Sequence, residues 1–140
     1  MLMKRRGFTL IELLIVVVII GLLAAIAIPK FANTKEKAYI ASMKSDLRNL
    51  MTAEEAYYAD SIAYTDQVDC SNPPAAGSAA WCPSNGNTLD QLRLANGNKS
   101  GWTARETNAN TAISCAIYVG NANPLRPAKN SDPDGVPVCQ

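Results

Sequence analysis

The chain has 140 residues, of which 48% are hydrophobic, and its formal net charge is +1 at pH 7. This length allows one small domain and one long helix, and the near-neutral charge excludes a strongly basic surface that would bind nucleic acid. The sequence contains no histidine for acid–base chemistry, and it shows no phosphate-binding glycine loop and no nucleophile motif. We therefore expect neither an enzyme nor a bound cofactor.

The first predicted element is a long apolar helix behind a short basic stretch. A basic cluster, residues 4–6, precedes residues 13–28, which are apolar without exception. A helix over residues 8–28 would measure about 32 Å at about 1.5 Å per residue, which matches the ~30 Å hydrocarbon layer of a bilayer. A basic cluster before such a helix keeps the N-terminus in the cytoplasm and exports whatever follows. We therefore expect a helix inserted in the membrane and an exported domain.

A single carboxylate, Glu12, interrupts the apolar segment near its start. A carboxylate inside a bilayer is costly unless it is paired or neutralised, and no Lys or Arg lies in the helix within one or two turns of it. The partner of Glu12 is therefore expected to come from outside the segment. Cleavage between Gly7 and Phe8 would create an α-amino group one turn away. The same amine on a neighbouring copy could pair with Glu12 and set the axial register between adjacent helices.

Two other interpretations fit the apolar segment. An ordinary signal peptide would be cleaved at the small-x-small site at residues 25–27. A plain signal anchor would hold an extracytoplasmic binding domain or an enzyme at the membrane. Neither interpretation gives Glu12 a role, so the cost of burying its charge counts against both.

Residues 4–29, KRRGFTLIELLIVVVIIGLLAAIAIP, resemble the class III signal and N-terminal helix of type IV pilins, in particular of type IVa-like major pilins. The short basic leader, Gly7 before the cut, Phe8 after it and Glu12 all match the family pattern. The resemblance implies that a prepilin peptidase removes the leader and methylates the amine of Phe8. It also implies that subunits wait in the inner membrane until pilus assembly machinery adds them to a homopolymeric surface filament for adhesion, twitching motility or DNA uptake. A major pseudopilin of a type II secretion system shares this N-terminus and is the nearest alternative.

The helix is expected to continue beyond Pro29 as an amphipathic helix over residues 30–60. Pro29 cannot donate a helical hydrogen bond, so a kink is expected there. Residues 22–28 are the part easiest to unwind, and the resemblance implies that this part is extended in assembled filaments. We place the charged residues of the second half, Asp46 among them, on the faces opposite an apolar stripe with spacings of three and four. The stripe consists of Tyr39, Met43, Leu47, Leu50, Met51, Glu54 and Tyr58.

The rest of the chain is expected to form a small globular head. An antiparallel sheet of three or four strands laid on the helix would bury the apolar faces of both. The predicted fold is therefore α+β, with a long N-terminal helix packed on a small antiparallel sheet. Residues 70–87 and the tail from residue 124 are rich in Pro and Gly and are expected to be loops. Strand character is found in residues 88–94, 102–107 and 112–119, with a hairpin turn at residues 108–110.

Four cysteines lie on the exported side, which favours two disulfides. A zinc site is the competing interpretation. With no histidine and no C-x-x-C pair, however, its four thiolates would have irregular spacing. Closure of local loops favours a bond between Cys70 and Cys82 and another between Cys115 and Cys139.

The tail contains the run Asp132-Pro-Asp134-Gly135, which resembles a fragment of a calcium loop. It lacks the terminal bidentate glutamate of an EF-hand. We therefore expect a solvated turn there and no metal site.

These patterns divide the chain into four parts with different expected roles. Gly7 and Phe8 are the predicted processing junction, and Phe8, Glu12 and Pro29 are the predicted assembly residues. The parts are a leader (1–7), a membrane-spanning and filament-core helix (8–29), an amphipathic helix (30–60) and a disulfide-bonded head (61–140).

Overall fold

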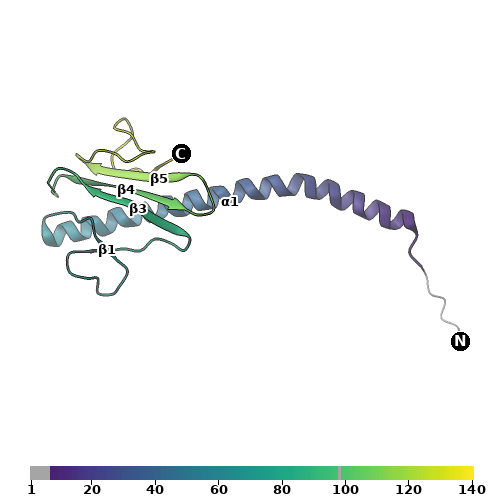
Figure 1. The fold of residues 1–140 in the computed structure, drawn as a ribbon, viewed down its shortest axis with the longest axis horizontal. Helices are drawn as coiled ribbons and strands as arrows, with labels where there is room; N and C mark the ends of the chain where they lie inside the picture. The colour runs from purple at the N-terminus through teal and green to yellow at the C-terminus, as the bar shows by residue number, and fades with distance from the viewer. Residues whose placement is uncertain (1–6, 98) are drawn as a thin grey trace. The chain divides into compact units, whose positions relative to one another are not determined.

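The structure is a computed structural model that describes residues 7–97 and 99–140. All of the predicted leader except Gly7, including the basic cluster, lies outside the described residues. The described elements are α1 (Leu10–Ser61), β1 (Val68–Asp69), β2 (Ala79–Ala80), β3 (Asn87–Leu94), β4 (Gly101–Asn108), β5 (Ser114–Gly120) and β6 (Val138–Cys139). Strands β3, β4, β5 and β6 form, in that order, an antiparallel four-stranded sheet, and β1 pairs with β2 in parallel. Figure 1 shows β3, β4 and β5 side by side. This is the predicted α+β fold.

The chain divides into two compact units, Met1–Lys35 and Glu36–Gln140. The boundary between them falls inside α1, so the first unit holds the apolar part of that helix. The second unit, called the head below, holds the rest of α1 and every described strand. Each unit is described by itself.

Helix α1 agrees with the predicted long helix to within two residues at either end. It ends where Ile62 adopts a left-handed backbone conformation, with φ of 55°. The amide of Ile62 donates to the carbonyl of Tyr58 at 2.8 Å, which satisfies one of the carbonyls that a helix end leaves without a partner. The side chain of Ile62 is exposed.

The buried face of α1 in the head contains the predicted apolar stripe and one residue that the prediction missed. Met43, Leu47 and Leu50 are fully buried, as is Glu54. Asp46 is only 3% exposed, so its predicted position on a solvent-exposed face was wrong. On a helix, position 46 lies beside positions 43 and 50, three and four residues away. Helix geometry alone therefore places Asp46 on the buried face. The prediction assigned it to an exposed face because its side chain is charged.

The sheet contributes the other half of the core. Strands β3, β4 and β5 coincide with the predicted strands to within two residues. Trp102 and Ala104 of β4 and Ile117 of β5 pack in one cluster with Met43, Leu47 and Leu50 of α1. Gly101 and Gly120 are paired at one end of β4 and β5. A Cβ on Gly101 would overlap the backbone of Val119 on β5, and one on Gly120 would overlap the backbone of Ser100, just before β4. The two strands can therefore approach this closely only with glycine there.

The face of the sheet away from α1 is also covered, by the C-terminal tail. Ala116 and Tyr118 of β5 form a second cluster with Ala122 and Ala128 of the tail. Four consecutive residues of β5 are buried, so this strand is covered on both of its faces. The tail is also not entirely a loop, because β6 pairs with β5. A strand of two residues has no periodicity to read from the sequence.

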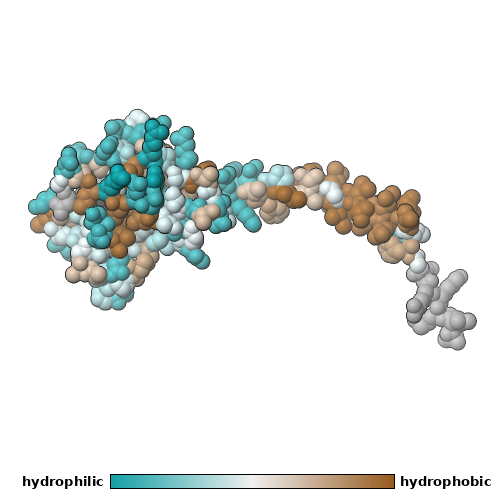
Figure 2. Space-filling model, in the orientation of Figure 1, coloured by the Kyte–Doolittle hydropathy of each residue, from teal (hydrophilic) through white to brown (hydrophobic). Residues whose placement is uncertain are grey.

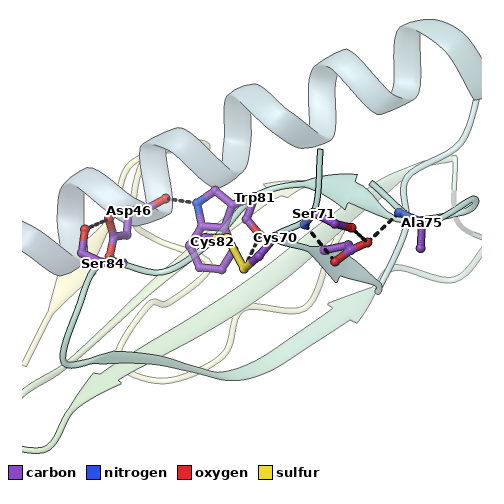
Figure 3. Close-up of a disulfide and its surroundings, with 8 residues drawn as sticks. Asp46, Cys70, Ser71, Ala75, Trp81, Cys82 and Ser84 are labelled. Atoms are coloured by element: carbon purple, nitrogen blue, oxygen red, sulfur yellow. Dashed lines mark hydrogen bonds between the residues drawn. A yellow bond between two sulfur atoms is a disulfide. The ribbon is translucent and has the colours of Figure 1, made fainter. Parts of the chain in front are cut away.

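The segment between α1 and β3 is held on α1 by hydrogen bonds to Asp46 and Glu54 of that helix. The indole N–H of Trp81 donates to the backbone carbonyl of Asp46 at 3.0 Å, and the amide of Ser84 donates to the Asp46 carboxylate at 2.7 Å (Figure 3). Two turns further along α1, Glu54 accepts from the amide of Thr65 at 3.2 Å. The segment between α1 and β3 is thus anchored to α1 near both of its ends. Residues 70–87 of it were predicted to be a loop, but they contain the short strand β2.

All four cysteines are joined in disulfides, Cys70 with Cys82 and Cys115 with Cys139. This is the pairing that closure of local loops favoured, and it leaves no thiolate for a zinc site. The first bond closes a loop of the segment between α1 and β3. The second joins β5 to β6 and therefore holds the tail on the sheet.

Replacing Cys115 and Cys139 together with alanine should lower the free energy of unfolding of the head by about 3 kcal/mol, because the bond closes a loop with a sequence separation of 24 residues. Urea unfolding of the full chain in non-ionic detergent micelles measures this change. The matched control is the double alanine variant at Cys70 and Cys82, whose loop of 12 residues is shorter and should contribute less. A Cys115/Cys139 variant as stable as the unmodified chain would contradict this account of the tail.

Candidate assembly and processing site

The start of α1 is closed by a reciprocal cap between Thr9 and Glu12. The backbone N–H and the hydroxyl of Thr9 each donate to Oε2 of Glu12 at 2.8 Å, and the backbone N–H of Glu12 donates to the Thr9 hydroxyl at 3.3 Å. This is a capping box, in which the side chains of the cap and of the third helical residue satisfy each other's backbone amides. It explains why the helix begins at Leu10 and not at Phe8.

The capping box revises the expectation that Glu12 has no partner within its own segment. The partner is Thr9, and the signal for it, threonine followed three residues later by glutamate, was present in the sequence but was not used. The cap supplies hydrogen bonds but no positive charge. Within residues 7–97 and 99–140, no Lys or Arg forms an ion pair with Glu12.

Gly7 and Phe8 lie just outside the helix and are accessible. Both are exposed, Phe8 with 81% of its surface. Neither belongs to a helix or strand. Apart from its chain neighbours, no described residue has an atom within 4 Å of the position that a Cβ on Gly7 would take. The peptide bond between these two residues is therefore sterically open, as a processing junction requires.

The apolar part of α1 presents large hydrophobic side chains in every direction. The large apolar residues from Leu10 to Ile28 are between 46% and 83% exposed, and Figure 2 shows hydrophobic residues covering this part of the helix continuously. By length and composition α1 can cross a membrane. A helix that is apolar all round needs either lipid or other helices around it.

Pro29 does not interrupt α1, which is helical on both sides of it. One turn later the hydroxyl of Thr34 donates to the carbonyl of Lys30 at 2.9 Å. The predicted unwinding of residues 22–28 concerns assembled filaments and stays a prediction. The same holds for the assembly role of Pro29.

Two aspartates of the tail, which resembled part of a calcium loop, accept hydrogen bonds from backbone amides. Asp132 accepts from Lys129 at 2.8 Å, and Asp134 accepts from Gly120 at 3.2 Å. These contacts are those of a turn that holds the tail beside the end of β5.

Comparison with known proteins bears on the N-terminal part of the chain. Residues 2–28 match the family model described as the prokaryotic N-terminal methylation motif. The chain has the N-terminal segment of a type IV prepilin.

The curated relatives are similar over a limited part of their length. The type IV major pilin protein PilA of Myxococcus xanthus is 46% identical over 63 residues, which cover 45% of this chain and 29% of that protein. The type IV major fimbrial protein FimA of Dichelobacter nodosus is 46% identical over 56 residues, covering 40% and 36%. The type II secretion system core protein G of Escherichia coli is 43% identical over 61 residues, covering 44% and 42%. The matches thus span less than half the length of each of these relatives.

Proposed function

We propose that this chain is the structural subunit of a type IV pilus. A prepilin peptidase cuts between Gly7 and Phe8 and methylates the new amine, and the mature chain stays in the inner membrane through the apolar part of α1. Assembly machinery then transfers it to a helical filament of identical subunits on the cell surface. The filament serves adhesion, twitching motility or DNA uptake.

One observation carries this proposal, namely an apolar helix that exposes hydrophobic side chains on all sides and holds one carboxylate, Glu12, near its start. Lipid alone would satisfy the apolar surface but not the charge. A bundle of copies of the same helix satisfies both, because the amine of Phe8 on one copy can reach Glu12 on its neighbour. The apolar packing then supplies most of the attraction, and the ion pair specifies the register.

The capping box gives this pairing a defined geometry. Both hydrogen bonds from Thr9 go to Oε2 of Glu12. Among the described residues Oε1 has no hydrogen-bond partner, and we assign this oxygen to the amine of the neighbouring subunit. Thr9 fixes the rotamer of Glu12 and is a positioning residue for assembly.

A second candidate function is that of a major pseudopilin of a type II secretion system. The similarity to core protein G of Escherichia coli, which covers about as much of this chain as the similarity to PilA, favours it. The two candidates differ in where the filament ends. Antibody labelling of intact cells detects a surface pilus, whereas a pseudopilus is labelled only after the outer membrane is opened.

We expect the protein recovered from cells to begin at methylated Phe8, and its intact mass to be lower by two hydrogens for each of the two disulfides. N-terminal sequencing and intact-mass spectrometry measure both features at once. As a control, replacing Gly7 with valine should leave the leader attached, because a branched side chain then occupies the open position before the cut. A chain that begins at Ile28 would show cleavage of an ordinary signal peptide and would refute the proposal.

A further inference from the structure

A cluster of buried polar residues lies between α1 and the sheet, next to the segment that connects α1 to β3. Asp46 of α1 is 3% exposed and Glu106 of β4 is fully buried, and Asn87 and Asn108 beside them are 7% and 5% exposed. Asn87 donates to Asp46 at 2.7 Å, and Asn108 donates to Asn87 at 2.7 Å. The cluster places two carboxyl groups in an interior that excludes water.

Asp46 is the ionised member of this pair. Burial opposes its ionisation, but hydrogen bonds from the Asn87 amide, the Ser84 hydroxyl and the Ser84 backbone N–H outweigh burial and hold the pKa of Asp46 below its ordinary value. The donors lie at 2.7 Å in each case. Three donors directed at one carboxylate stabilise its charged form.

Glu106 lacks any comparable support for a charge. Neither of its carboxyl oxygens receives a hydrogen bond from an N–H or a hydroxyl group of the described residues, and no Lys or Arg among those residues forms an ion pair with it. Its cross-strand neighbours are Leu89 on β3 and Cys115 on β5, which is in a disulfide. Within the described part of the chain, the charged group that acts on Glu106 is the carboxylate of Asp46 on α1. Burial, followed by the charge of Asp46 and a hydrogen bond to it, raises the pKa of Glu106 to about 9.

We propose that Glu106 and Asp46 share a single proton that fastens strand β4 to helix α1, so that loss of this proton at alkaline pH loosens the contact between sheet and helix. The carboxyl group of Glu106 donates, and the carboxylate of Asp46 accepts. Removing the proton leaves two negative charges side by side with no cation to offset them. The head then either opens to admit water or loses stability.

The direction of the pH dependence follows from linkage. The folded chain holds the Glu106 proton to about pH 9, whereas the unfolded chain releases it near 4.5. The folded state is therefore favoured most at low pH, and it loses this advantage as the pH rises from about 4.5 to about 9. Burial raises the pKa of Glu54 to about 7, against a hydrogen bond from Thr65, so Glu54 adds to the loss only up to about pH 7. Above that pH, Glu54 has lost its proton, whereas Glu106 still holds its own up to about pH 9.

The test is urea unfolding of the full chain in non-ionic detergent micelles at several pH values between 7 and 9. Unfolding of the head can be followed by tryptophan fluorescence, because Trp81 and Trp102 are both buried in it. Histidine and cysteine side chains do not contribute to the pH dependence in this range, since the sequence has no histidine and its cysteines are in disulfides. Burial raises the pKa of Tyr64 to about 12, beyond the range.

For the unmodified chain we expect the ratio of folded to unfolded protein to fall by up to about tenfold per pH unit between pH 7 and 9. Glu106→Gln keeps an N–H donor for Asp46 but cannot ionise, so its ratio should be flat over this range. Glu54→Gln is the matched control and should keep the slope of the unmodified chain. A Glu106→Gln profile that superimposes on that of the unmodified chain would overturn the proposal.

A second measurement needs no variant and remains decisive if Glu106→Gln fails to fold. Infrared spectroscopy of the folded, unmodified chain at pH 8, with ¹³C-labelled glutamate, should show a protonated glutamic acid carbonyl band. Its absence would overturn the proposal. A calcium titration gives a further test. If millimolar calcium stabilised the unmodified chain against urea but had no effect on Glu106→Gln, a bound cation would occupy the place assigned to the proton, and the proposal would be overturned.

Discussion

Replacing Glu12 with alanine should abolish filament formation and leave membrane insertion intact. The change removes the single charged residue within residues 10–28 and makes the helix more apolar, which favours insertion. It also removes the group that would bind the amine of Phe8 on a neighbouring subunit, so adjacent helices lose the contact that sets their axial register. Electron microscopy of material sheared from cells measures the filaments, and immunoblotting of the membrane fraction measures insertion.

Two further variants separate the charge of Glu12 from its role in the helix cap. In Glu12→Gln the side-chain amide oxygen can still accept from Thr9 in the capping box but carries no charge, and we expect it to form no filaments either. Ile11→Ala is the matched control, because it shortens the neighbouring exposed side chain and keeps the charge, so filaments should persist. Normal filaments from both Glu12 variants would remove the assembly role of this residue.

Replacing Asp46 with alanine should lower the free energy of unfolding of the head by about 3–5 kcal/mol, the range expected when one member of a buried charged network is deleted. The substitution leaves the amide and hydroxyl of Ser84 and the side-chain amide of Asn87 without their acceptor. It also removes the acceptor of the Glu106 proton. Buried donors that lose their partners bear the full cost of their desolvation. Urea unfolding in detergent micelles at pH 7, followed by tryptophan fluorescence, measures the change.

Asp60→Ala provides the control for Asp46→Ala. Asp60 is exposed near the end of the same helix, and its removal should change the free energy of unfolding by no more than about 0.5 kcal/mol. If Asp46→Ala were as stable as this control, the donors would have found other partners, and Asp46 would not anchor the segment between α1 and β3.

The two variants are expected to affect filaments for different reasons. Glu12→Ala leaves the fold of the head unchanged, because Glu12 lies in the other compact unit of the chain. Asp46→Ala weakens the head and leaves the apolar segment untouched. Tryptophan fluorescence of the membrane-inserted subunit therefore distinguishes a defect of assembly from a defect of folding.

The elements with long, strong patterns were predictable from the sequence. The uninterrupted apolar segment and the stripe with spacings of three and four gave α1 to within two residues at each end. Alternation and the flanking turn residues gave β3, β4 and β5. The N-terminal motif was equally accessible, because its chemistry lies within a few consecutive residues and needs no tertiary contact to be recognised.

The capping box shows a local signal that was present but not used. Thr9 and Glu12 are three residues apart, and their reciprocal hydrogen bonds require only the first turn of the helix. Attention to the cost of the Glu12 charge led us to expect a partner in another molecule. Hydrogen bonding within the segment and charge pairing between subunits are separate requirements, and the first is already met in the single chain.

The remaining features depend on contacts between residues that are distant in the sequence. β6 pairs with β5 across 24 residues, and Asp46 meets Glu106 across an even longer stretch of chain. No periodicity in the sequence predicts such contacts. A two-residue strand is shorter than any repeat, and nothing in the sequence around an aspartate on a helix shows which residues will pack against it. The helix, the main strands and the chemistry of the N-terminus could be predicted, because they follow from local periodicity and from a contiguous motif. Which charges are buried, and which groups satisfy them, could be learned only from the folded chain, because burial is a property of the packed chain and not of the residue.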